Sequence, residues 1–316
     1  MSATEVTPAV SNRAGRPRRF NFGRSVPLML LAPTAIILVG VFGYPLYRMI
    51  MLSFQNLTTR DLYTDTAPAW VGFAQYTAIL QDRDFWDSLI RTVIFTAATV
   101  AVSVVLGLLV AMMLNRVSPW VKILVTTVLM FVWSVPQIVS IQLFSWMTDT
   151  NFSVVSWLLS QIPGVHMQGH DWFLNPHEGL AVASFVVIWG ALPFLAITLH
   201  AGMTMVPREL LEAARMDGAS GWRVFRAVTL PIIKPLLVIV TTLSIVWDIQ
   251  VFNQIWLLRQ GAPDQSYWTL SIFVYNRAIA NTQYSPASAI GLITVLLMLG
   301  VMVFYIRTIF RIGDND

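Results

Sequence analysis

Six long apolar runs divide this chain of 316 residues, and they constrain its fold more than any other feature. Each run is long enough to cross a bilayer, which takes about 20 residues of helix. A segment in lipid must satisfy its own backbone hydrogen bonds, so each run is predicted to be a helix. Only 11% of the residues are charged, whereas soluble domains carry about 25%. The sequence therefore predicts an all-α membrane protein with six transmembrane helices, over residues 26–54, 92–114, 123–148, 179–206, 235–258 and 287–306.

Basic residues gather on one side of the predicted membrane. Arginines crowd the residues before the first run, and the segment after the fourth run holds Arg208, Arg215, Arg223, Arg226 and Lys234. Such residues favour the cytoplasmic side, so both termini and this segment are predicted to be cytoplasmic. The basic N-terminal tail is interpreted as part of this signal, and an arm that binds anionic lipid is the alternative. Because the basic residues sort by membrane side, the net charge of +4 is not interpreted as a sign of nucleic-acid binding.

The polar segment 212–231, EAARMDGASGWRVFRAVTLP, lies between the fourth and fifth apolar runs. Apolar residues recur at helical spacing before Gly218, and glycine is typical of a position that ends a helix. Ser220 can cap a second helix, which Pro231 is expected to end. The pattern predicts a helix–turn–helix. An ordinary amphipathic cytoplasmic hairpin, without a coupling role, is the alternative interpretation of this segment.

The spacing of Glu-Ala-Ala, Gly218 and Leu-Pro in this segment resembles the EAA loop of permease subunits in binding-protein-dependent ABC importers, carbohydrate-uptake type. The resemblance covers about residues 88–311. Val228 stands where the family usually has Ile, and Ala262 departs from a usual Gly-Gly-Pro, which leaves the shape of that outer turn open. The residues to which the resemblance assigns coupling to an ATPase are Glu212, Ala213, Ala214, Asp217, Gly218, Ala219, Leu230 and Pro231.

The resemblance implies a type I ABC importer permease fold in a bacterial plasma (inner) membrane. It divides the chain into a cytoplasmic basic tail at 1–25, a six-helix permease domain at 26–310 with a coupling hairpin at 205–233, and a cytoplasmic tail at 311–316. The implied partners are a second permease subunit in a heterodimer, two ATP-binding subunits, an extracytoplasmic solute-binding protein, membrane lipid, and a sugar or polyol as substrate. The implied mechanism is alternating access driven by closure of the ATPases.

Polar and aromatic side chains inside the third and fifth predicted helices are candidates for the solute pathway, because polar groups in a membrane are costly. A ring can cover the C–H face of a sugar while amides bind its hydroxyls. Those of the fifth helix are expected on one face, except Asp248, which is expected roughly opposite. Hydrogen bonding between helices is the alternative role for the amides. The candidates are Trp133, Gln137, Ser140, Trp247, Asp248, Gln250, Asn253 and Gln254.

Motifs for catalysis and for metal binding are not found in the sequence. Neither Lys122 nor Lys234 follows a glycine, so the sequence has no P-loop. His166, His170 and His177 fit no standard zinc spacing, and the chain has no cysteine. The chain is therefore predicted not to be an enzyme and to bind no metal or cofactor, with ATP and Mg²⁺ used by the partner subunits.

An ion-driven secondary transporter is the main alternative function. Such a protein is expected to have inverted repeats and carboxylates in several helices, whereas Asp248 is the only carboxylate in the six predicted helices. A membrane enzyme would need a clustered nucleophile or metal set, and a scaffold would leave the polar helix faces unexplained. Co-purification with ATPase subunits separates an importer permease from these alternatives.

Overall fold

The computed structural model describes residues 25–64 and 66–313, and the chain divides into two units at Arg48 and Met49. The first unit holds α1 (Ser25–Leu38), the π-helical turn η1 (Val39–Gly43) and the start of α2 (Tyr44–Ser53). The predicted tail at 1–25 lies outside the described residues except for Ser25, and the tail at 311–316 is described only to Gly313.

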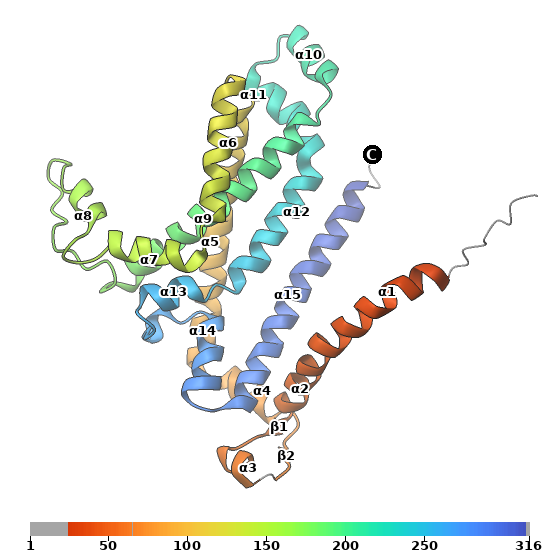
Figure 1. Ribbon diagram of the computed structural model, residues 1–316, viewed down its shortest axis with the longest axis vertical. Helices are drawn as coiled ribbons and strands as arrows, with labels where there is room; N and C mark the ends of the chain where they lie inside the picture. Colours follow the sequence, from red (N-terminus) through yellow and green to blue (C-terminus); the bar gives the residue numbers. More distant parts are fainter. Residues whose placement is uncertain (1–24, 65, 314–316) are drawn as a thin grey trace, which may run out of the picture. The chain divides into compact units, whose positions relative to one another are not determined.

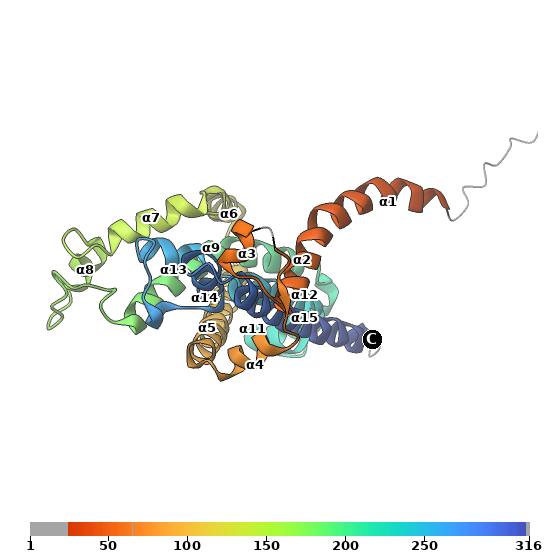
Figure 2. The ribbon, with the colours of Figure 1, turned by 90° about the horizontal axis from the view of Figure 1, so that it is seen from below.

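The second unit is built around long apolar helices (Figures 1 and 2). They are α5 (Arg83–Leu114), α6 (Pro119–Ser134), α7 (Gln137–Met147), α9 (Pro176–Thr204), α12 (Leu230–Ile249) and α15 (Tyr284–Gly313). The described residues hold five helices able to cross a membrane, or six if α6 and α7 form one bent span. The predicted all-α membrane class is confirmed, and the orientation of the termini stays a prediction.

Two of the predicted membrane helices are broken. α6 and α7 meet at an angle of 96°, because Val135 is extended ahead of Pro136, a residue that disfavours helix before it. The chain therefore turns almost at a right angle between the two helices. The prediction that the fifth apolar run forms one continuous helix was wrong. α12 ends at Ile249, and a separate helix, α13 (Asn253–Leu258), follows.

Short elements connect the long helices. After α2, a two-stranded antiparallel sheet pairs β1 (Gln55–Asn56) with β2 (Ala69–Trp70) around α3 (Thr59–Thr64). The remaining connections hold α4 (Ala74–Gln81), α8 (Val154–Leu159), η3 (Gln265–Tyr267), α14 (Leu270–Tyr275) and the π-helical turn η4 (Asn276–Ala280). Figure 1 shows α13 and α14 near the same end of α12.

Small residues allow the closest helix packing in the second unit, where α5 lies against α9. A Cβ added to Gly107 of α5 would lie 2.6 Å from the Cβ of Leu195 on α9, so the glycine permits the approach. A Cβ added to Gly202 of α9 would likewise overlap the Leu236 side chain of α12, so this glycine permits the approach of α9 and α12. Around these contacts lies a buried apolar cluster that includes Ala111 and Leu199. α5, α9 and α12 therefore form the closely packed core of this unit.

Candidate functional site

The polar hairpin after α9 begins with α10 (Arg208–Met216), which ends at a glycine-dependent cap. Gly218 has a φ of +78°, a conformation that glycine adopts without a Cβ penalty. The backbone N–H of Gly218 donates to the Arg215 carbonyl at 3.0 Å, and that of Ala219 donates to the Ala214 carbonyl at 3.1 Å. These two bonds form a Schellman motif, which satisfies the carbonyls at the helix end. The predicted helix stop at Gly218 is confirmed.

The second helix of the hairpin starts where Ser220 was predicted to cap it. The Ser220 side chain accepts a hydrogen bond from the Arg223 backbone N–H, and α11 (Gly221–Val224) follows. The prediction that Pro231 ends this helix was wrong. A π-helical turn, η2 (Phe225–Thr229), leads directly into α12, and Pro231 lies in the first turn of α12, where a missing N–H is tolerated. The hairpin is thus continuous with the membrane helix after it.

The base of the hairpin packs against the end of α9, whereas its outer face is exposed. Phe225 and Leu211 pack with the buried Met203 and Val206 near the end of α9. The coupling candidates Glu212, Ala213, Asp217 and Gly218 are exposed. So are two large apolar side chains beside them, Met216 at 88% and Trp222 at 62%. This surface has the exposed apolar character of a protein contact. Figure 1 shows α10 beyond the end of α12 that lies opposite α13.

A cavity of about 390 Å³ lies where the two broken helices meet α9. Six of the eight candidates for the solute pathway line it: Trp133, Gln137, Ser140, Trp247, Asp248 and Gln254. Trp189, Gly190 and Phe194 of α9 complete one wall, and the sequence analysis missed them as cavity residues. Gly190 and Phe194 are four residues apart, which places them on the same face of a helix. This spacing in the fourth apolar run is the sequence signal that could have found them.

The two remaining candidates, Gln250 and Asn253, do not line this cavity. Gln250 donates to the Val246 carbonyl of its own helix at 3.1 Å. The side-chain amide of Asn253 donates to the side-chain carbonyl of Gln137 at 3.0 Å. The expectation that Trp247, Gln250, Asn253 and Gln254 share one helix face was wrong, because the chain leaves the helix between Ile249 and Asn253. The cavity nevertheless brings Trp247 and Gln254 together from two separate helices.

Aromatic rings form a row along one side of the cavity. The ring centroids of Trp133 and Phe194 are 6.3 Å apart in a stacked arrangement, and those of Phe194 and Trp247 are 5.4 Å apart edge to face. Both distances fall in the range of favourable aromatic pairs. The row joins α6, α9 and α12, and it leaves Trp133 and Trp247 largely exposed. The site therefore offers flat apolar surfaces next to carboxamide groups.

Asp248 is buried and bound to a neighbouring helix. The hydroxyl of Thr99 on α5 donates to its Oδ2 at 2.6 Å, and both residues are buried. Asp248 lines the same cavity as Trp247 rather than facing the opposite side as expected. No basic side chain forms an ion pair with it within residues 25–64 and 66–313. The carboxyl group thus ties α12 to α5 at the cavity wall.

Comparison with known proteins gives consistent matches along the chain. A family model for the binding-protein-dependent transport system inner membrane component matches residues 103–311. The diacetylchitobiose uptake system permease protein DasB of Streptomyces coelicolor is 32% identical over 294 residues, or 93% of this chain and 89% of that protein. The trehalose/maltose transport system permease protein MalF of Thermococcus litoralis is 30% identical over 280 residues, or 89% and 92%.

A solved structure shares the fold. A chain of the bacterial alginate ABC transporter in complex with alginate pentasaccharide-bound periplasmic protein superposes with a TM-score of 0.76 at 20% sequence identity. The match covers 90% of this chain and 94% of that chain. This chain therefore shares its overall fold with a chain of that transporter.

Proposed function

This chain belongs to the family of binding-protein-dependent transport system inner membrane components, and on that premise we propose that it forms the solute pathway of an ATP-driven sugar importer. The observation that carries the proposal is the cavity where the two broken helices meet α9, whose lining combines aromatic rings with carboxamides. The substrate class is a sugar or related polyol. Family membership favours this function over an ion-driven secondary transporter.

The cavity walls suit a neutral, hydroxyl-rich solute. Trp133 and Trp247 offer ring faces to the C–H surface of a sugar, and Gln137 and Gln254 can both donate to and accept from hydroxyl groups. Asp248 adds an acceptor whose position is set by Thr99. The relatives named for diacetylchitobiose and for trehalose/maltose support a saccharide as the solute.

The hairpin of α10 and α11 is the proposed contact with a separate ATPase. Its exposed Met216 and Trp222 can enter an apolar groove, with Glu212 and Asp217 at the edge of the contact. Because η2 runs directly into α12, a movement of the hairpin is transmitted to the helix that carries Trp247 and Asp248. This continuity gives alternating access a mechanical path from the ATPase to the cavity.

The proposed assembly contains this chain, a second permease, two ATP-binding subunits and an extracytoplasmic solute-binding protein. The hairpin faces the cytoplasm in this arrangement, and the cavity receives solute from the binding protein. ATP and Mg²⁺ are used by the ATP-binding subunits, so this chain contributes the pathway and the coupling contact. The chain itself binds the solute and positions the coupling contact, and ATP hydrolysis takes place in the ATP-binding subunits.

Reconstitution of the assembly in proteoliposomes tests the proposal. Uptake of a saccharide panel that includes diacetylchitobiose, trehalose and maltose is expected to require both ATP and the binding protein. Glu212→Lys is expected to reduce ATPase association while membrane insertion stays normal. Glu209→Lys, one turn earlier on the same exposed helix, is the matched charge change and is expected to retain association. Accumulation of solute by this chain without an ATPase would contradict the proposal.

A further inference from the structure

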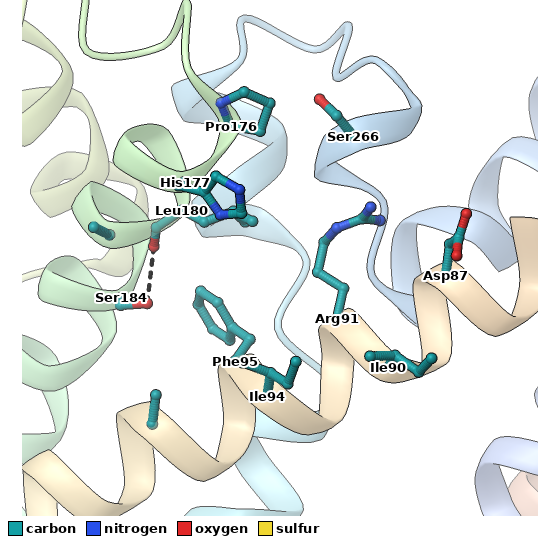
Figure 3. A pocket seen from close by; sticks show the side chains of 12 residues that line it. Asp87, Ile90, Arg91, Ile94, Phe95, Pro176, His177, Leu180, Ser184 and Ser266 are labelled. Atoms are coloured by element: carbon teal, nitrogen blue, oxygen red, sulfur yellow. Dashed lines mark hydrogen bonds between the residues drawn. The ribbon is translucent and has the colours of Figure 1, made fainter.

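A second cavity, of about 640 Å³, opens between α5 and the first turns of α9 (Figure 3). It shares no lining residue with the cavity of the proposed solute pathway. Most of its wall is apolar, including Ile94 and Phe95 from α5 and Leu180 from α9. The hydroxyl of Ser184 donates to the Leu180 carbonyl at 2.8 Å, so its proton is already used within α9. This wall suits a hydrocarbon rather than a sugar.

Charged and polar groups stand at one end of this cavity. Nη1 of Arg91 donates to the backbone carbonyls of Trp268 and Gln265, at 2.6 and 3.2 Å, which holds the guanidinium at the rim. Its Nη2 and Nε make no hydrogen bond to any of the described residues. Figure 3 shows the His177 ring across the opening from Arg91. It also shows the Asp87 carboxylate, which lies on α5 one helical turn before Arg91.

The cavity follows α5 for about the depth of one leaflet. From Asp87 to Ala98, α5 rises about 16 Å, close to the ~15 Å hydrocarbon depth of one leaflet. The cavity therefore has about the length of one leaflet and carries charged groups at one end only.

We propose that this cavity binds a phospholipid with a zwitterionic, amine-bearing head group, of the phosphatidylethanolamine type. The planar guanidinium of Arg91 matches a phosphate, and His177 adds a ring nitrogen on the facing side. Asp87 provides the complementary negative charge for the ammonium group, beside its exposed ion pair with Arg83 at 3.8 Å. The acyl chain lies along Ile94, Phe95 and Leu180. An anionic lipid without an amine would leave Asp87 as an unfavourable neighbour of its phosphate.

Lipid retention by the purified importer assembly tests this site. The assembly is equilibrated in nanodiscs of equal dioleoyl-phosphatidylethanolamine and dioleoyl-phosphatidylglycerol, and native mass spectrometry counts the lipids it keeps. Ala98→Trp fills the cavity from α5 and is expected to lower phosphatidylethanolamine retention at least fivefold. Ala97→Trp is the matched control, since Ala97 is exposed on the same helix but does not line the cavity. Ala181→Trp fills the cavity from α9 if Ala98→Trp fails to assemble.

Head-group recognition is tested in the same mixture. Asp87→Asn is expected to reduce a severalfold preference for phosphatidylethanolamine to about one, while total lipid retention persists. Equal retention by the wild type and both cavity-filling variants would overturn the site. Equal retention of the two lipids by the wild type would overturn the head-group assignment. Loss of the second permease from Ala98→Trp with unchanged lipid retention would show that the cavity takes a protein segment instead.

Discussion

The side-chain amide of Asn253 donates a hydrogen bond to the side-chain carbonyl of Gln137 at 3.0 Å, and this contact joins the two breaks in the membrane helices. Gln137 is the first residue of α7, directly after the break at Pro136, and Asn253 is the first residue of α13. Both lie next to the proposed solute pathway. The pair is therefore placed to hold the two irregular segments together in the arrangement that the structure shows.

Removal of either partner is expected to loosen α7 from α13. A neutral hydrogen bond contributes about 1 kcal/mol, or roughly a fivefold shift in an equilibrium. Gln137→Leu and Asn253→Leu should each speed labelling of a cysteine introduced at Ser140 about fivefold, and the double variant should add little. The native chain has no cysteine, so the label reports one position. Gln142→Leu, on the exposed side of α7, is the control. Fully additive effects would show that the two amides act independently.

The turn of the hairpin is expected to depend on Gly218. Its φ of +78° is strained for a β-branched residue, so Gly218→Val should disorder the turn and reduce ATPase association and uptake several-fold. Gly221→Ala is the matched control, because a Cβ there would have only Arg116 Nη2 nearby, at 3.7 Å. Co-purification with the ATPase measures the effect. Normal association of the Gly218→Val variant would remove the turn from the coupling path.

A side chain at Gly107 is expected to destabilise the contact of α5 with α9. A Cβ there would lie 2.6 Å from the Leu195 Cβ, which cannot swing away as the end of a flexible side chain can. Overpacking of this kind costs about 1–3 kcal/mol. Gly107→Ala should therefore lower the thermal unfolding midpoint of the purified assembly by several degrees. Gly300→Ala on α15, where no heavy atom lies within 4 Å, should leave it unchanged.

The connection between β1 and β2 is expected to loosen in acid. Hydrogen bonds from the Thr58 side chain and backbone, and from the Thr66 hydroxyl, hold the pKa of Asp61 below its ordinary value of 3.8. Because folding lowers this pKa, the stabilisation is complete above the unfolded-state value and is lost as pH falls through the folded-state value. Hydrogen exchange of α3, corrected for intrinsic rates, should rise below about pH 4. The Asp61→Asn variant should show the faster exchange already at pH 7, and no difference between the two proteins at pH 7 would contradict the role.

Local features of the fold were predictable because their causes are local. Hydropathy marked the long apolar helices, since each must satisfy its own backbone in lipid. The stop at Gly218 and the cap at Ser220 followed from the conformations that these two residues favour. The resemblance carried by the same segment agreed with the family match over residues 103–311. The error at Pro231 arose because proline is tolerated in the first turn of a helix as well as after its last.

The break between α12 and α13 and the shape of the two cavities were decided by tertiary structure. Neither Gly nor Pro occurs from Gln250 to Phe252, so the sequence offered no signal for a break there. The contacts at the proposed solute pathway join residues far apart in the chain, Asn253 to Gln137 across 116 positions and Asp248 to Thr99 across 149. A helical period relates only residues within one helix. The apolar runs of the sequence therefore determined which polar groups enter the membrane, while packing between helices determined which of them meet.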